Sequence, residues 1–361
     1  MERKAAVDAN RVFLITIVLS MIWVYLPGIN QISDIFVLQI LTQLFLILPA
    51  VLYVVVNQKH LVTSVGIKRI SWSDFVWLIV LALLFNPIVT LLNDISMLFV
   101  VNTTGTHMIE LMEDKPLVVS VLVIGVLPAV CEEFVYRGVL YQNYRKSSVL
   151  KAILLSAFLF GIMHMNLNQF FYAFFLGILF AIVNEAVGSL IPSMLIHFMN
   201  NAMSTVGMFT ALKTLRGLRE EYVAAEQAGN VTKMEEILAY VGDVPIASEN
   251  WLEEYMSMEP YTVQEIIQYD LAPAVICAVL AFFVIRLLAK KNSREDHLKR
   301  IFVKKKKQVQ EDKTEGLEDT VNKPFGCKEK KQRIVSVALI VGIAICVVNM
   351  ILYELLIHNM L

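Results

Sequence analysis

Two adjacent carboxylates and an arginine interrupt a long apolar stretch between Pro116 and Leu140. They are Glu132, Glu133 and Arg137. The stretch is long enough to cross a bilayer as one helix, and charged side chains in hydrocarbon usually carry function. Glu133 and Arg137 stand four residues apart and can form an ion pair on one helix face, whereas Glu132 points about 100° away. One carboxylate can thus be neutralised while the other stays available for chemistry.

Two histidines lie well inside later apolar stretches, each at a helical spacing from a second residue. Phe160 precedes His164 by four residues, and His197 precedes Asn201 by four. Each pair therefore shares one helix face. Together with Glu132 these residues bring polar groups from three predicted helices into the membrane interior, where such groups seek one another or a water-filled cavity.

Hydrolysis is the chemistry that this set could perform. Glu132 could act as general base toward a water molecule, with His164 sharing that water or its proton. His197 and Asn201 could donate hydrogen bonds to the oxyanion of a tetrahedral intermediate. Glu132, His164 and His197 are also acceptable zinc ligands, although the sequence lacks the H-E-x-x-H pairing of many zinc peptidases. Both a glutamate-based and a metal-based mechanism stay open.

The other polar and aromatic residues of the chain have simpler structural interpretations. We expect Glu185, near a predicted helix end, to be solvated or interfacial. We expect the phenylalanines of 170–180 to face lipid or fill the core. The four cysteines are far apart and form no C-x-x-C pair, so they predict free thiols and neither a disulfide framework nor a zinc knuckle.

The composition indicates a polytopic membrane protein. Of its 361 residues 57% are hydrophobic and 17% charged, with a mean hydropathy of +0.64, whereas soluble domains carry about 25% charged residues. Nothing in the charge distribution suggests binding to nucleic acid. We expect an all-α bundle of about nine transmembrane spans around a membrane-embedded polar cavity. The expected spans are residues 11–34, 35–58, 75–101, 116–141, 151–166, 169–187, 189–209, 271–289 and 334–353.

These spans divide the chain into four regions. Residues 1–115 hold the first three helices, and residues 116–209 form the catalytic core of helices four to seven. Residues 210–269 form an acidic extracytoplasmic segment with two short helical pieces, at 219–226 and 232–240. Residues 270–361 hold the last two helices and a basic loop, 290–333.

Lysine and arginine mark the cytoplasmic loops of membrane proteins. Nine spans that start from a cytoplasmic amino terminus place every basic connection in the cytoplasm, including 59–69 and 144–151. One inconsistency concerns the 151–166 span. His164 would lie near its outer end, whereas Glu132 and His197 would lie nearer the cytoplasm, although the three side chains must meet. Either this span begins later than Lys151, or it is tilted and broken near Gly161.

The combined motifs resemble those of a known family, the CAAX-protease and bacteriocin-processing family of intramembrane proteases, also called Abi. The resemblance covers about residues 116–205 and includes three motifs, Glu132-Glu133-x-x-x-Arg137, Phe160-x-x-x-His164 and His197-x-x-x-Asn201. It implies an intramembrane endopeptidase that cleaves a membrane-associated peptide or protein tail.

The resemblance also implies a role for each motif residue. Glu132 with His164 activates water, and His197 with Asn201 forms the oxyanion pair. The remaining motif residues support them: Glu133, Arg137 and Phe160. The family has been described both as metalloproteases and as glutamate-based hydrolases, so a zinc ion is compatible with the motifs but not required.

The implied partners are a peptide or protein substrate, prenylated or unmodified, and membrane lipid. The implied location is a bacterial plasma membrane. Two other classes of function use the same residues. One is a catalytically silent scaffold or bacteriocin-immunity protein, and the other is a transporter with Glu132, Glu133 and Arg137 as an ion relay. A transporter should show inverted repeats, and the sequence has no internal repeat.

Overall fold

The computed structural model describes residues 2–26, 32, 34–57, 59–100, 108–109, 111–112, 115–242, 244–249, 251–256, 262–302 and 334–360. Within these residues every regular element is a helix, so the predicted all-α class is confirmed. Seven helical segments of the described chain are long and apolar enough to cross a membrane by length and composition.

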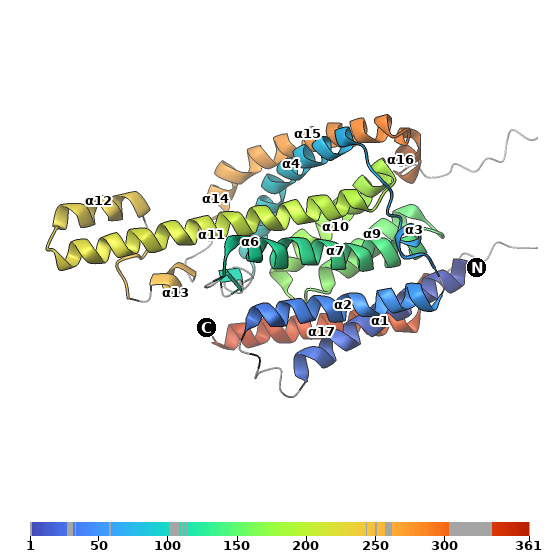
Figure 1. Cartoon of the computed structure of the whole chain (residues 1–361), viewed down its shortest axis with the longest axis horizontal. Coiled ribbons are helices and arrows are strands. Elements are labelled where there is room, and N and C mark those ends of the chain that lie inside the picture. Colours follow the sequence, from blue (N-terminus) through green and yellow to red (C-terminus); the bar gives the residue numbers. More distant parts are fainter. Residues whose placement is uncertain are drawn as a thin grey trace, which may run out of the picture.

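The helices follow one another along a chain that folds into an elongated bundle (Figure 1). Those outside the central segment described below are α1 (Glu2–Tyr25), α2 (Ile35–Val56), α3 (Leu61–Ser64), α4 (Trp72–Met97), α9 (Val149–Ile162), α10 (Leu167–Val187), α11 (Ile191–Gln227), α12 (Val231–Val241), α13 (Trp251–Met256), α14 (Val263–Glu265), η4 (Ile266–Leu271), α15 (Ala272–Lys291), α16 (Glu295–Phe302) and α17 (Val337–Met360).

A helix lies at each of the nine predicted positions, but three of the nine differ from the expected spans. Helix α1 occupies Glu2–Tyr25 rather than residues 11–34. Helix α9 has only 14 residues and ends at Ile162, because Met165 adopts a positive φ of 52° and Asn166 already caps α10. Helix α11 is 37 residues long and continues past the apolar stretch. His164 therefore lies in the turn after α9 rather than at the outer end of a longer span, which removes the inconsistency in depth.

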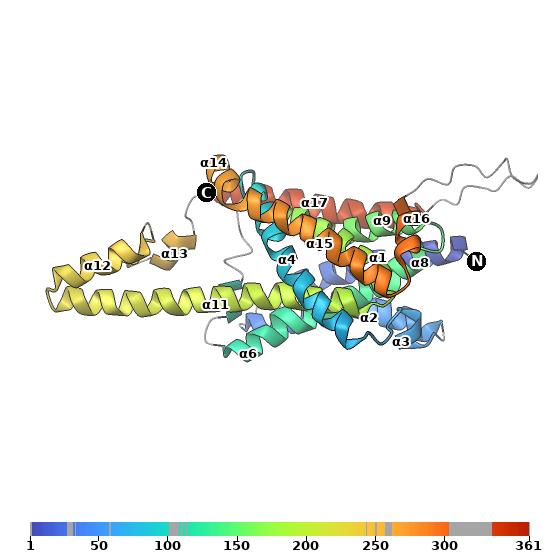
Figure 2. The same cartoon turned by 90° about the horizontal axis from the view of Figure 1, so that it is seen from above.

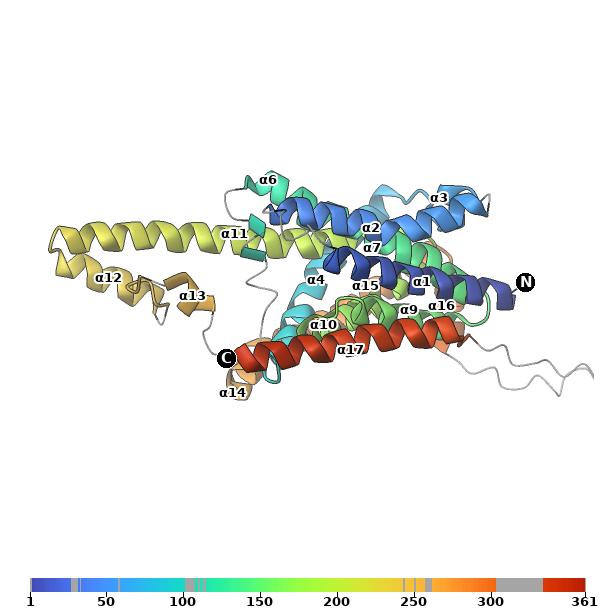
Figure 3. The same cartoon turned by 90° about the horizontal axis from the view of Figure 1, so that it is seen from below.

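The central segment of the bundle is the apolar stretch Leu117–Tyr144. It runs through α6 (Leu117–Ser120), η2 (Val121–Val126), α7 (Leu127–Glu133), η3 (Phe134–Leu140) and α8 (Tyr141–Tyr144). Helices α1, α2, α9 and α11 pack against it. Helix α17 packs along α1, so the first and last helices lie on one side of the bundle, with the two termini at opposite ends of its length (Figure 3). On the other side α4 pairs with α15 (Figure 2).

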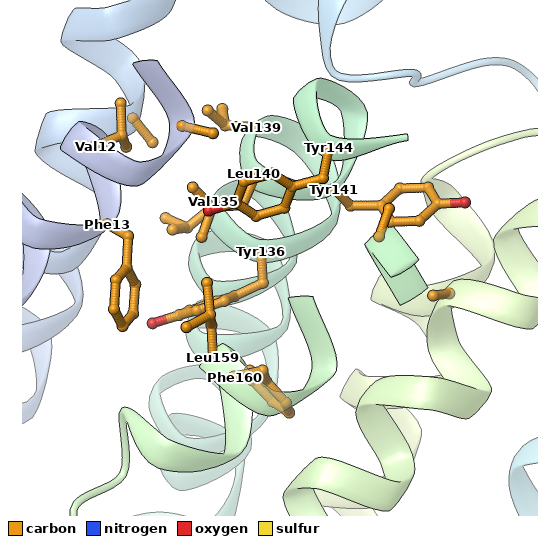
Figure 4. Close-up of a cluster of buried hydrophobic side chains, with 14 of the residues drawn as sticks. Val12, Phe13, Val135, Tyr136, Val139, Leu140, Tyr141, Tyr144, Leu159 and Phe160 are labelled. Atoms are coloured by element: carbon orange, nitrogen blue, oxygen red, sulfur yellow. The ribbon is translucent and has the colours of Figure 1, made fainter. Parts of the chain in front are cut away.

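The largest apolar core surrounds η3 and α8 (Figure 4). Tyr136 and Tyr144 are fully buried there, with Phe13 of α1 on one side and Leu159 of α9 on the other. Burial of one large apolar side chain contributes about 1.5–3 kcal/mol. The hydroxyl of Tyr144 also donates to the side-chain oxygen of Asn10, at 2.7 Å. The segment that follows the two carboxylates is thus held on several sides.

Helices α11 and α12 form a hairpin that extends beyond the bundle (Figure 1). It has a small core of its own around Tyr222, Ile237 and Ile246. The two predicted helical pieces are therefore confirmed, although the first is a continuation of α11 rather than a separate helix. Cys131, Cys277 and Cys346 are free thiols, as predicted. Cys327 and most of the basic loop lie outside the described residues.

Glu185 is not solvated, contrary to one of the two expectations for it, because its side chain is only 3% exposed. It accepts a hydrogen bond from the hydroxyl of Tyr141 at 2.7 Å and lies 2.8 Å from Arg145. Arg294 and His297 reach it from the other side, at 3.0 and 2.6 Å. Glu185 is buried because α16 and the turn before it fold back over the end of α10.

Candidate active site

The helix that carries the two carboxylates changes its winding on both sides of them. Wide π-helical turns, η2 and η3, flank the seven residues of α7. Pro128 explains the first irregularity, because it has no N–H to donate to the carbonyl of Ile124 four residues earlier. The side-chain amide of Asn201 donates to that carbonyl instead, at 3.1 Å. A residue of α11 thus satisfies the acceptor that Pro128 leaves free.

The adjacent glutamates have different surroundings. Glu133 is fully buried, as is Arg137, and the guanidinium donates to its carboxylate at 2.8 Å. This confirms the predicted ion pair. The carboxylate of Glu132, 6% exposed, accepts a hydrogen bond from the amide of Gln43 on α2 at 2.9 Å. Glu133 is neutralised by a cation, whereas Glu132 receives only a neutral donor.

His197 lies between the two carboxylates. Its Nδ1 is 3.2 Å from Oε1 of Glu133, and its Nε2 is 3.8 Å from Oε2 of Glu132. The ring of Phe180 stacks on the imidazole with centroids 5.4 Å apart. Because Nδ1 is bonded to Glu133, Nε2 is the nitrogen of His197 that faces Glu132 and can contact a substrate.

Two aromatic rings enclose the guanidinium of Arg137. Its central carbon lies 4.1 Å from the ring centroid of Phe160 and 5.3 Å from that of Phe180. Such contacts favour a cation that is withdrawn from water. On the side of α10 the guanidinium meets Gly177, where a Cβ would lie 2.8 Å from Nη2. The fully buried arginine therefore needs a glycine on the neighbouring helix.

His164 occupies the turn between α9 and α10. Its Nδ1 lies 2.9 Å from the carbonyl oxygen of Phe160 and 3.3 Å from that of Gly161. A carbonyl can only accept, so Nδ1 carries the proton and Nε2 is left as an acceptor in the neutral ring. His164 also interacts electrostatically with Glu132 and His197.

Phe160 connects the histidines to the ion pair. The imidazoles of His164 and His197 meet its ring edge to face, with centroids 5.2 and 5.8 Å apart. The structure thus brings six of the seven predicted residues into one contact network: Glu132, Glu133, Arg137, Phe160, His164 and His197. Asn201 lies one turn beyond His197 on α11, and its side-chain amide contacts the carbonyl of Ile124.

Three residues of this site were not predicted. Gln43 donates to Glu132, Phe180 stacks on His197, and Pro128 frees the acceptor of Asn201. Gln43 had a signal in the sequence, because a side-chain amide within an apolar span is expensive without a partner. Phe180 had none, since it is one phenylalanine among several in its helix. We expected the phenylalanines of 170–180 to face lipid or fill the core, and this expectation does not include the contact of Phe180 with His197.

The sequence leaves two mechanisms open, and one of them requires a metal ion bound by Glu132, His164 and His197. Within the described residues, no group of three or more His, Cys, Asp or Glu side chains is arranged to hold a metal ion. Nδ1 of His197 is engaged by Glu133, and Nδ1 of His164 by backbone carbonyls. These bonds leave Nε2 of both rings, the nitrogen through which such histidines bind zinc, but the predicted ligand set of Glu132, His164 and His197 is not assembled as a metal site in the described part of the chain.

Comparison with known proteins bears on the same segment. Residues 114–203 match the family described as type II CAAX prenyl endopeptidase Rce1-like. The matched residues include all three motifs and the whole contact network from α7 to the first half of α11, apart from Gln43. No curated protein and no solved structure matches the chain. The match is to the family that the three motifs predicted, and it supports endopeptidase activity within a membrane in general.

Proposed function

We propose that this protein is an intramembrane endopeptidase in which Glu132 activates the attacking water. The observation that carries the proposal is the unequal treatment of the two glutamates. Arg137 neutralises Glu133 at 2.8 Å, while Glu132 has the neutral donor Gln43 and faces His197. A general base needs a carboxylate that is held in position but not consumed by a cation.

The histidines act on the two sides of that carboxylate. His164, with Nδ1 bonded to a carbonyl, presents Nε2 as an acceptor that can share the water or its proton. His197, with Nδ1 bonded to Glu133, presents Nε2 next to Glu132. In its imidazolium form, in which both ring nitrogens carry a proton, His197 can donate from Nε2 to the oxyanion of the tetrahedral intermediate, and this donation lowers the barrier.

Asn201 contributes the second donor to the oxyanion. A side-chain amide has two N–H groups, and the carbonyl of Ile124 takes one of them. That bond fixes the orientation of the amide and leaves the second N–H for the reacting carbonyl. A donor that is oriented before the reaction costs no reorganisation during it.

The substrate is a membrane-associated peptide or protein tail, either prenylated or unmodified. The protein spans a bacterial plasma membrane with its amino terminus in the cytoplasm, because the basic connections then lie inside. The proposed step needs no metal ion, because Glu132 itself supplies the base that activates the water.

Peptidase assays on the purified protein in liposomes test this function. Native protein is compared with Glu132→Gln, His164→Ala and the control Glu220→Gln, which alters an exposed carboxylate on the distal part of α11. The substrates are prenylated and unmodified peptides, each with and without a zinc chelator. Loss of the general base should lower kcat by about 10²- to 10⁴-fold, while thermal unfolding confirms that each variant is folded.

The outcomes separate the candidate functions. Loss of cleavage in Glu132→Gln and His164→Ala but not in Glu220→Gln supports the proposal, and insensitivity to the chelator supports the glutamate mechanism. Loss of activity with the chelator, restored by added zinc, would replace that mechanism with a metal-based one. A folded Glu132→Gln protein with full activity would rule out the role of Glu132.

A further inference from the structure

A polar pocket lies at the end of the bundle where α2 and α8 terminate. It has a volume of about 210 Å³ and is separate from the carboxylate network. A water molecule takes up about 30 Å³ of liquid, so the pocket can hold a group considerably larger than one water. Its polar lining includes Lys59, Lys146, Ser64, Gln142 and Asn143.

The charge of this pocket is unbalanced. Two lysines line it, and its lining contains no carboxylate. Nζ of Lys59 donates to the hydroxyl of Tyr53 at 2.8 Å, and Nζ of Lys146 donates to the side-chain oxygen of Asn143 at 3.2 Å. Both acceptors are neutral, and the described residues contain no ion pair of either lysine. Partial desolvation and the neighbouring charge of Lys59 lower the pKa of Lys146, whose side chain still reaches solvent, as expected for cations that lack an anion.

The pocket also contains a donor without an acceptor. The side-chain oxygen of Ser64 is buried, and it has no hydrogen-bond partner among the described residues. Buried polar atoms of this kind are uncommon and call for a partner. Two ammonium groups and a free hydroxyl around one cavity are a donor set for an anion with several oxygens, of which phosphate is the commonest in a membrane.

The walls of the pocket are already fixed. Gly66 lies so close to Gln142 that a Cβ would be 2.7 Å from its amide nitrogen, and its φ of +84° itself favours glycine. The carbonyl of Gly66 accepts from the N–H of Leu190 at 3.0 Å. Val65 packs on Gly138 of η3 in the same way. The loop after α2 is therefore held against the central segment without a ligand.

The depth of the pocket indicates where the anion comes from. The apolar spans Ile35–Val56 and Leu117–Tyr144 end just before Lys59 and Lys146, respectively. Lysines at such positions lie at the level of the lipid headgroups. The phosphate of a lipid in that leaflet is thus at the height of the two ammonium groups.

We propose that this pocket, formed by Lys59, Lys146 and Ser64, binds the phosphate group of an anionic membrane phospholipid. The proposal does not depend on the proteolytic function, because none of these residues belongs to the carboxylate network. The bound lipid would bridge α2 and α8, which lead directly to Gln43 and to the two glutamates.

Native mass spectrometry of the full-length protein tests this site. The probes are phosphatidylglycerol, phosphatidylcholine and inorganic phosphate, each added to protein in detergent. The Lys59→Gln/Lys146→Gln protein is compared with Lys68→Gln/Arg69→Gln, which removes the same charge from exposed residues at the same end of the bundle. We expect at least tenfold weaker binding of phosphatidylglycerol in the first and at most a twofold change in the second.

Ser64→Ala provides a variant that should fold like the native protein, since its hydroxyl has no protein partner to lose. Its melting temperature should be unchanged and its affinity for phosphatidylglycerol several-fold lower. An equal loss of affinity for phosphatidylglycerol in both double variants would show that positive surface charge in general attracts the lipid, and it would overturn the proposal. Binding of inorganic phosphate without binding of the lipid would overturn the lipid as its source.

Discussion

The two adjacent glutamates have different contact partners in this protein, and these partners give them different chemical roles. Glu132 and Glu133 are consecutive, and both are almost completely buried. Glu133 contacts Arg137 and Nδ1 of His197, so its carboxylate is committed to an ion pair and to orienting an imidazole. Glu132 accepts from the neutral amide of Gln43 alone among the described hydrogen bonds. Position in the helix, rather than residue type, decides which carboxylate is available.

The amide of Gln43 should matter to catalysis without touching the substrate. Hydrogen bonds to a charged group contribute about 1.5–3 kcal/mol, so Gln43→Leu should reduce kcat roughly ten- to a hundredfold because Glu132 is no longer held in place. Gln39→Leu, one turn earlier on α2, is the matched control and should keep native kcat. Steady-state kinetics on folded protein check this, and a Gln43→Leu enzyme with native kcat would contradict the role of the bond.

At the scale of the helices, proline and glycine decide how closely the site can be assembled. Pro128 removes one hydrogen bond from the central helix, and the π-helical turn next to it exposes the carbonyl of Ile124 to Asn201. Gly177 lets α10 approach both the guanidinium of Arg137 and the backbone of Ala157. These residues carry no chemistry, yet the functional side chains depend on them for position.

A double-mutant cycle measures the link between Pro128 and Asn201. Asn201→Leu should destabilise the protein by about 1–3 kcal/mol, because a buried carbonyl loses its donor. In a Pro128→Ala background the new N–H can serve that carbonyl, so the same substitution should cost at least about 1 kcal/mol less. Unfolding in detergent gives the energies. Pro192→Ala, in the first turn of α11 where no such bond is lost, should be additive with Asn201→Leu.

The close approach at Gly177 predicts a clear difference between two glycines. Gly177→Ala places a methyl group 2.8 Å from Arg137 Nη2 and 2.9 Å from the Cα of Ala157, and such overpacking costs about 1–3 kcal/mol. Gly207→Ala on α11 meets no atom within 4 Å and should be neutral or stabilising by up to about 1 kcal/mol. Thermal unfolding of both variants checks this, and equal melting temperatures would contradict the packing described for α10.

At the scale of the whole molecule, separate parts of the chain are tied together at their ends. Asn10 of α1 donates to the carbonyl of Ile334 and to the hydroxyl of Ser336 just before α17, each at 2.8 Å. Glu185 joins α8, α10 and α16 through two arginines, a histidine and a tyrosine. The distal part of α11 and α12 have a core of their own around Tyr222, Ile237 and Ile246, whereas the first turns of α11 carry His197 of the carboxylate network.

Removal of the charge of Glu185 should loosen α16 without unfolding the bundle. Glu185→Gln leaves the cations of Arg145 and Arg294 without their carboxylate, which should cost about 1–3 kcal/mol because these partners still reach water. Hydrogen exchange of residues 294–302 should become faster. Glu295→Gln breaks only more exposed pairs with Arg286 and Lys299 and should leave this exchange nearly native. Unchanged exchange in Glu185→Gln would show that Glu185 does not anchor α16.

The sequence alone determined which side chains share one face of a single helix. The pairs Glu133–Arg137 and Phe160–His164 meet as predicted, because residues four apart lie on one face whatever surrounds the helix. The length and apolarity of the stretches likewise predicted the bundle and nine helical positions, and the three motifs predicted the family.

Only the tertiary structure decided which helices face each other and at what depth. The donor of Glu132 comes from 89 residues earlier in the chain, and Nδ1 of His197 reaches a carboxylate 64 residues away. Periodicity specifies a helix face but not the rotation or height of the neighbouring helix. For this reason Gln43 and Phe180 were not predicted and the burial of Glu185 was not foreseen. Only the structure shows which of the two alternatives holds for the 151–166 span, because α9 ends at Ile162.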